Sequence, residues 1–318
     1  MIDLNKRKVG LVLGCGAVAG AAWSIPVLAE LQRQCDWNAN RADVLIGTSV
    51  GAVLAALLGA GVSVETLLAS QQDELNHSRC EWDHATSSGP WYPPLPRLQF
   101  SGLPLLKKGL RGEVSALTAV CGALPQGSFD MTPFRNLINA HVERGAWVQH
   151  PACWIMAVDN ASGERVAFGR DSAPSTSLVD AVCASYAVPG WCPPVKIQGK
   201  TYLDGGIASP VSADLLADTD VDIVIVLAPM ASRDIETKPA LLARAERFAR
   251  RYMTRIVDQE VVALHQAGKT VIRLEPGAED LRAFGYNMMD PRRRTQVLST
   301  ALSTAPTTVR QALQTARV

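Results

Sequence analysis

One serine stands in a pattern that suits nucleophilic chemistry. Residues 47–51 read Gly-Thr-Ser-Val-Gly, with Ser49 at the centre. An aliphatic segment runs into Gly47 and a small-residue segment leaves from Gly51, which predicts a sharp strand-to-helix turn. Flanking glycines leave room for neighbouring backbone, and the helix N-terminus favours a developing negative charge. Ser49 is therefore a candidate nucleophile; the alternative is a serine that only caps a core helix.

A serine hydroxyl needs a base, and Asp204 is the best candidate. It ends a short aliphatic segment and is followed by Gly205 and Gly206, which permit a tight turn. Active sites of parallel sheets assemble where strands end in this way. The ordinary pKa of an aspartate is about 3.9, so burial would have to raise it. The alternative is an Asp-Gly turn with no catalytic role.

Histidine bases fit less well. His265 follows Asp204 in the serine–aspartate–histidine order of α/β-hydrolases, but it falls inside a predicted long helix. The other four histidines precede Asp204, and we interpret them as loop or surface residues.

A glycine loop is the third candidate element. Residues 14–20 read Gly-Cys-Gly-Ala-Val-Ala-Gly and follow the first predicted strand. A dinucleotide loop would need an acidic residue at the end of the second strand, where Gly47, Thr48 and Ser49 stand instead. We therefore expect backbone N–H groups that face an oxyanion beside Ser49, and no nucleotide cofactor.

Strands and helices are predicted to alternate along the chain. Strand patterns cover residues 9–13, 43–46, 152–158, 165–168, 201–203, 221–227 and 270–274. Helical patterns cover residues 20–34, 49–58, 64–76, 177–185, 238–267 and the chain after Pro291. This predicts an α/β fold with a mostly parallel sheet covered on both faces. We expect a single domain over residues 1–318. Residues 77–110, where prolines and aromatic residues gather, are predicted to be irregular and extended, and to form a cap or lid. The alternative is a surface loop that packs on its own domain.

Two uncharged runs, residues 9–29 and 44–64, have the length of membrane spans. Each contains several glycines between an aliphatic stretch and an Ala/Leu-rich stretch. Strand, tight turn and buried helix, repeated twice, is the interpretation that this order favours.

Composition excludes several classes of protein. The 318 residues carry 31 Lys+Arg and 30 Asp+Glu, so no basic excess points to nucleic acid. The seven cysteines are widely spaced, without a Cys/His cluster, which disfavours a metal site and a disulfide scaffold. Reduced cysteines fit a cytoplasmic protein best.

The three elements together resemble the patatin-like phospholipases, a family of serine acyl hydrolases with a Ser–Asp dyad. The resemblance is carried by residues 14–20, 47–51 and 204–206, in that order. Further stretches at 157–163, 187–194 and 287–291 resemble the bacterial branch, so the likeness spans roughly residues 8–305.

The resemblance implies a three-layer αβα fold and a set of roles. Ser49 would be the nucleophile and Asp204 the general base, and no metal or cofactor would be needed. The oxyanion would be held by backbone N–H groups of Cys15, Gly16 and Ala17. The substrate would be a phospholipid, a lysophospholipid or a smaller acyl ester, with peripheral contact to a membrane.

This chain departs from the family pattern in its glycine loop. Cys15 and Ala17 replace glycines, and Ala19 stands where a basic residue is usual. A non-catalytic lipid-binding or regulatory protein is therefore one alternative to an esterase. Acyl transfer to an alcohol is a second alternative, because it shares the acyl-enzyme. The arginines of the helix around residues 241–256, Arg250 among them, are read as a solvated face in preference to a membrane-binding stripe.

Overall fold

The computed structural model describes residues 3–72, 82, 84, 92–95, 99, 102–233 and 241–316. Eight strands within these residues form one sheet. Their bounds are β1 Val9–Leu13, β2 Val44–Thr48, β3 Cys153–Asp159, β4 Arg165–Phe168, β5 Val195–Ile197, β6 Lys200–Asp204, β7 Ile223–Leu227 and β8 Thr270–Leu274. The strands pair in the order β5-β6-β3-β2-β1-β7-β8, and β4 pairs with β3.

The sheet has a parallel half and an antiparallel half. Strands β3, β2, β1, β7 and β8 pair parallel to one another. Strands β4 and β6 pair antiparallel with β3, and β5 pairs antiparallel with β6. The expectation of a mostly parallel sheet is therefore confirmed, with an antiparallel extension beyond β3.

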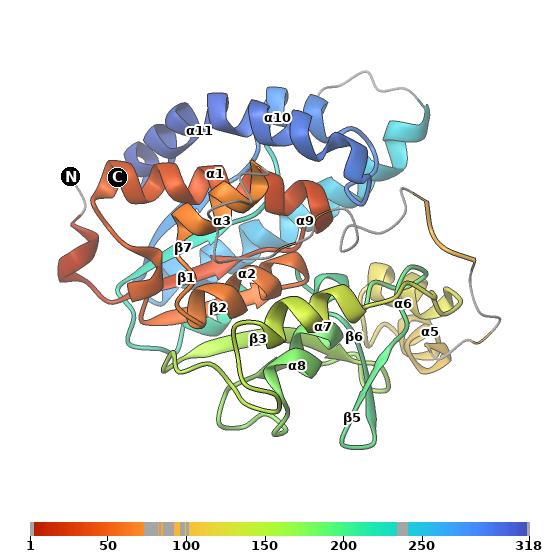
Figure 1. Cartoon of the computed structure of the whole chain (residues 1–318). Coiled ribbons are helices and arrows are strands. Elements are labelled where there is room, and N and C mark those ends of the chain that lie inside the picture. The colour runs from red at the N-terminus through yellow and green to blue at the C-terminus, as the bar shows by residue number, and fades with distance from the viewer. Residues whose placement is uncertain are drawn as a thin grey trace.

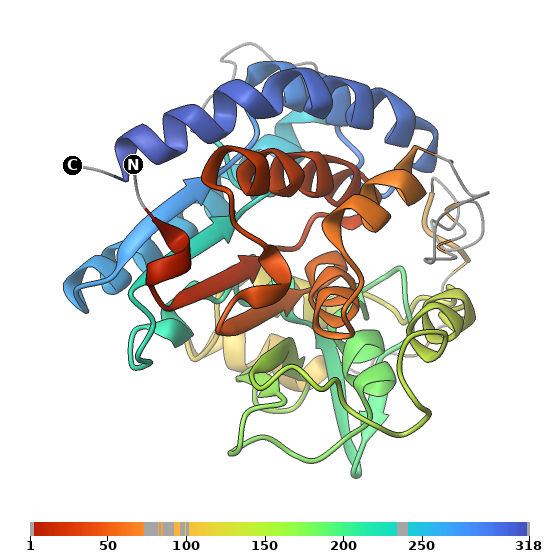
Figure 2. The ribbon, with the colours of Figure 1, turned by 60° about the vertical axis from the view of Figure 1, so that its left-hand side comes forward.

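Helices cover both faces of the sheet. Their bounds are α1 Ala17–Cys35, α2 Val50–Gly59, α3 Val64–Gln71, α5 Leu103–Leu110, α6 Ala116–Ala123, α7 Thr132–Asn139, α8 Leu178–Ser185, α9 Leu241–Gln266, α10 Ala278–Phe284 and α11 Arg294–Thr315. Helices α1 and α11 lie side by side above the strands (Figures 1 and 2).

The two faces bury different side chains of the same strands. Leu11 and Leu13 of β1 point into a core with α1, α2, α8 and α11, whereas Val12 points into a second core with Val257 and Leu264 of α9. This alternation follows from the two-residue period of a strand. It confirms the three-layer αβα fold.

The uncharged runs are buried strand–helix units, as expected. They contain β1 with α1 and β2 with α2, and their residues are almost all buried. Among the described residues, no helix is both long enough and apolar enough to span a bilayer.

The region around residues 77–110 differs in part from expectation. Most of residues 77–101 lie outside the described residues, so the cap or lid stays a prediction there, as does the single-domain organisation. Residues 103–110 were expected to be irregular, which is wrong, because they form α5. Pro104 lies in the first turn of this helix, where the missing N–H breaks no intrahelical bond, and Leu105 is buried beneath it.

Candidate active site

Ser49 lies on a strained turn between β2 and α2. Its backbone has φ 57° and ψ −122°, a conformation that is costly for a residue with a Cβ atom. The side chain makes no capping hydrogen bond to α2, which argues against the reading of a simple helix cap. A Cβ atom at Gly51 would lie 2.0 Å from the carbonyl oxygen of Leu13, and one at Gly47 would lie 2.4 Å from that of Gly51. Only glycines fit beside this serine.

The register of β3 brings Asp204 to this turn. Ile155 and Met156 of β3 pair with both β2 and β4, so those two strands lie on opposite edges of β3. Ala157 and Val158 pair with both β4 and β6, so β6 also lies opposite β4. Strands β2 and β6 therefore meet end to end along one edge of β3. Thr48 pairs with Met156 and Asp204 pairs with the next residue, which places the ends of the two strands together.

Asp204 is a buried carboxylate beside the serine. It is 4% exposed, and burial raises the pKa of its carboxyl group to about 7. Hydrogen bonds from the Ser49 side chain and the Gly206 backbone oppose this rise. The Gly206 N–H donates to Oδ1 over 2.7 Å, which fixes the carboxylate on the Asp-Gly-Gly turn. A Cβ atom at Gly205 would lie 2.6 Å from the carbonyl oxygen of Met156, so this turn also sits against the backbone of β3.

The glycine loop reaches the site, but one expected donor is wrong. The Cys15 N–H donates to the carbonyl oxygen of Pro210 over 2.8 Å, and the Gly14 N–H donates to that of Leu227 over 2.9 Å. These two bonds fix the backbone of the two residues that follow β1. Cys15 therefore has no N–H free for an oxyanion. Its side chain still lines the site, because a Cβ at Gly206 would be 3.1 Å from the Cys15 sulfur.

The backbone turns into α1 at Gly16 and Ala17. No acceptor within the described residues takes the N–H group of either residue. The first N–H groups of a helix lack intrahelical partners, and the helix dipole places partial positive charge there. Ala17 has φ 50°, so this loop keeps a left-handed backbone despite the Cβ atom. These two N–H groups are hydrogen-bond donors that the loop leaves available to an anion.

Three histidines of the described residues have polar partners other than the dyad residues. His265 is exposed on α9, and its Nδ1 lies 3.3 Å from the carbonyl oxygen of Lys269. His150 Nε2 lies 2.7 Å from the carbonyl oxygen of Ala42, and His84 Nε2 lies 3.2 Å from the hydroxyl oxygen of Ser70. His77 lies outside the described residues.

Two further residues, Ser185 and Pro210, hold the site and were not predicted from the sequence. The Ser185 hydroxyl accepts the Ser49 N–H over 2.8 Å, and Pro210 accepts the Cys15 N–H. Ser185 is the last residue of a helix that was predicted correctly, but its partner is 136 residues away in the chain. No local pattern reports such a contact.

A small pocket adjoins the site. Val18, next to Ala17, and Val50, next to Ser49, line it together with Phe134 and Tyr186. Gln71, His84 and Arg294 also line it, so the pocket combines apolar and polar side chains.

A serine on a strand-to-helix elbow, beside a carboxylate and backbone N–H groups without an acceptor, is able to attack an ester carbonyl carbon. A family model described as patatin-like phospholipase matches residues 11–217. The chain therefore belongs to the patatin-like phospholipase family, which supports lipid acyl hydrolysis as its general activity. The solved structure of VipD from Legionella pneumophila is similar at 12% identity, covering 98% of this chain and 67% of that chain with a TM-score of 0.45.

Proposed function

We propose that this chain hydrolyses carboxylic esters of lipids through an acyl-enzyme on Ser49, with Asp204 as the general base. One observation carries the proposal: the serine on the strained elbow stands at the end of β2, where the register of β3 brings the buried carboxylate of Asp204. Burial raises the pKa of this carboxyl group to about 7. A carboxyl group with that pKa is a far better proton acceptor at neutral pH than an ordinary aspartate.

Acylation begins when the Asp204 carboxylate accepts the hydroxyl proton of Ser49. The serine oxygen bonds to the ester carbonyl carbon, and the carbonyl oxygen becomes an oxyanion that accepts hydrogen bonds from the Gly16 and Ala17 N–H groups. The carbon–oxygen bond to the alcohol then breaks, and the protonated Asp204 gives its proton to the departing alkoxide. The acyl group remains on Ser49.

Deacylation repeats these steps with water. Asp204 accepts a proton from a water molecule, and the resulting hydroxide attacks the acyl carbon. When the tetrahedral intermediate collapses, Asp204 returns the proton to the Ser49 oxygen and the fatty acid leaves. Both half-reactions use the same base and the same donors, so the proposal assigns no step to a metal or cofactor.

The substrate class is proposed from the family. In the pocket beside Ser49, Val50 and Phe134 offer apolar contact to an acyl chain, and Arg294 lines the same pocket. We therefore propose a phospholipid, a lysophospholipid or a smaller acyl ester. A series of p-nitrophenyl esters of increasing chain length tests this: kcat/KM should rise with the first added methylenes, and a preference for acetate would contradict it. Adding an alcohol acceptor and analysing products separates hydrolysis from transfer.

We also propose peripheral membrane contact for a cytoplasmic enzyme, through the α5–α6 hairpin. Leu103, Leu110 and Val120 are largely exposed on it, next to the exposed Lys107. The Thr118 hydroxyl on α6 donates to the Ile207 carbonyl oxygen over 2.8 Å, which ties the hairpin to the turn after Asp204. Sedimentation with anionic vesicles should weaken in Leu110→Ser, whereas no binding by wild type would contradict the contact.

Covalent labelling tests the dyad. A fluorophosphonate should add one label to wild type, as measured by intact mass, and none to Ser49→Ala. Asp204→Asn should label at least a hundredfold more slowly. The exposed residues Ser299 and Asp218 provide the matched controls Ser299→Ala and Asp218→Asn, which should behave as wild type. A folded wild type with neither labelling nor ester turnover would overturn the proposal and favour a lipid-binding role.

A further inference from the structure

Arg250 is a buried cation that the dyad does not use. The sequence places it with the solvated arginines of α9, and for this residue the expectation is wrong, because it is 1% exposed. Burying a charge is costly unless it is paired and hydrogen-bonded. A guanidinium at this depth is stable only if other groups of the protein pair with it.

The guanidinium has partners on three sides. Nε donates to Glu246 on the preceding turn of α9 over 2.6 Å. One terminal nitrogen donates to the carbonyl oxygen of Pro229 over 2.8 Å, and the other lies 3.8 Å from the sulfur of Met288. Its carbon is 5.7 Å from the centre of the Phe284 ring. Burial lowers the pKa of Arg250, but an arginine keeps its charge in a protein.

Two of these partners touch the first turn of α1. A Cβ atom at Gly16 would lie 2.8 Å from the Pro229 ring, so the ring rests directly against the glycine loop. The carbonyl oxygen of Met288 accepts the Ala19 N–H over 3.1 Å. Arg250 thus holds both segments that enclose the N-terminus of α1.

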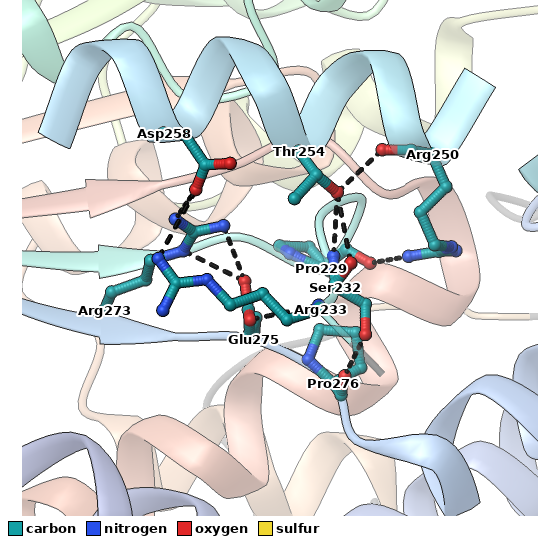
Figure 3. Close-up of polar contacts among 9 residues, drawn as sticks. All are labelled: Pro229, Ser232, Arg233, Arg250, Thr254, Asp258, Arg273, Glu275 and Pro276. Carbon is teal, nitrogen blue, oxygen red and sulfur yellow. Dashed lines mark hydrogen bonds and ion pairs between the residues drawn. The ribbon is translucent and has the colours of Figure 1, made fainter. Parts of the chain in front are cut away.

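Helix α9 fixes the same loop further along (Figure 3). Arg250, Thr254 and Asp258 follow one another at intervals of four residues and face the loops after β7 and β8. The Thr254 hydroxyl accepts the Ser232 N–H over 3.1 Å, and Asp258 pairs with Arg273. Pro229 is therefore part of a rigid segment, and the charge behind it has a fixed position.

The charge of Arg250 reaches the site. Burial raises the pKa of the Cys15 thiol, the Asp204 carboxylate adds to this rise, and the charge of Arg250 opposes it. Cys15 precedes the two free N–H groups. A cation behind these donors stabilises negative charge in front of them, and the effect is strong in a site that excludes water.

We propose that Arg250 is a positioning residue for the oxyanion site. Its fixed charge lies behind Pro229 and the first turn of α1, and it makes the Gly16 and Ala17 N–H groups stronger hydrogen-bond donors to an oxyanion. The inference rests on the proposed function, because it assumes an acyl-enzyme on Ser49. Arg250 acts through these groups and does not touch substrate.

The test compares turnover per active site among variants of the full chain. Arg250→Met removes the charge, Arg250→Lys keeps it, and Arg251→Met changes the exposed neighbouring arginine as the matched control. Active sites are counted by fluorophosphonate labelling, so a loss of folded protein does not register as a loss of kcat. We expect kcat of Arg250→Met to fall about tenfold with little change in KM. The kcat of Arg250→Lys should stay within about threefold of the wild-type value, and the kcat of Arg251→Met should equal it.

A second substitution guards against a poorly folded methionine variant. Glu246→Gln leaves Arg250 in place and removes the anion that partly neutralises it, so kcat should equal or exceed that of wild type. A tenfold fall in Glu246→Gln, an unchanged kcat in Arg250→Met, or a lysine variant as slow as the methionine variant would each overturn the inference. Failure of wild type to label on Ser49 would instead overturn the proposed function, and the inference with it.

Discussion

The two halves of the sheet supply different parts of the candidate site and hold them by different means. The parallel half contributes Ser49 after β2 and the glycine loop after β1. Its turns are packed backbone against backbone, as the 2.0 Å approach of a Gly51 Cβ to Leu13 shows. The antiparallel half contributes Asp204. Gly205 after it is packed against the backbone of β3, whereas the segment from Ser209 to Ala213 is held by hydrogen bonds.

Those hydrogen bonds converge on Glu260 of α9. Its carboxylate accepts the Ser209 hydroxyl over 2.5 Å and the Ala213 N–H over 2.7 Å, and Arg165 pairs with it at 3.5 Å. Close packing tolerates no added atom, whereas a hydrogen-bonded segment can shift by a few tenths of an ångström. Substitutions in the parallel half should therefore disrupt the fold, and those in the antiparallel half should mainly disturb catalysis.

Gly51→Ala is expected to have the largest effect. The added Cβ would meet backbone atoms of Leu13 and Gly14, which cannot move without breaking the pairing of β1. We expect a loss of about 3 kcal/mol or more in the free energy of unfolding, measured by urea denaturation. Gly59→Ala, in the same helix, meets the flexible Val148 side chain at 3.1 Å and is the control. Equal stability of the two variants would contradict the packing account.

Gly206→Ala should separate activity from stability. Its Cβ would lie 3.0 Å from Asp204 Oδ1 and 3.1 Å from the Cys15 sulfur, so the carboxylate has to move slightly. We expect kcat/KM to fall about tenfold, since small misplacements of a catalytic group are costly. The melting temperature should stay close to that of Gly59→Ala. A large drop in melting temperature with normal turnover per labelled site would show that the turn serves the fold instead.

Asp204→Asn should raise stability. Burial raises the pKa of Asp204 from 3.8 to about 7, so the folded state binds its proton more tightly than the unfolded chain does. Its contribution to the free energy of unfolding therefore becomes less favourable as the pH rises from about 4 to 7. At pH 8 the free energy of unfolding of the asparagine variant should exceed that of wild type by at most roughly 4 kcal/mol. This difference in stability should disappear as the pH falls toward 4. A less stable variant at pH 8 would contradict the cost of burying this charge.

Much of the parallel half could be predicted from the sequence, because its information is local. The uncharged runs that contain β1 and β2 report burial on both faces, and the glycines mark the turns after them. The Asp-Gly-Gly turn likewise indicated Asp204. The elements that join the two halves are short and have no such pattern: β5 has three residues, and the end-to-end meeting of β2 and β6 depends on the register of β3.

The errors at individual residues have the same origin. Cys15 was expected to donate to an oxyanion, but Pro210, almost two hundred residues later, takes its N–H. Arg250 shares a helix with exposed arginines, and only the packing of Pro229 and Met288 shows that it is buried. Periodicity describes one element at a time, whereas donors and buried charges are settled by contacts between elements.

The pH dependence of labelling at Ser49 decides whether Asp204 is the base for this serine. A carboxylate base works only when it is ionised, so the rate of fluorophosphonate labelling should be half-maximal near pH 7, where the pKa of Asp204 lies. Below that pH the rate should fall about tenfold for each unit. A rate that stays constant down to pH 5 would contradict a base with the pKa of the buried Asp204, and would remove the reason for pairing it with Ser49.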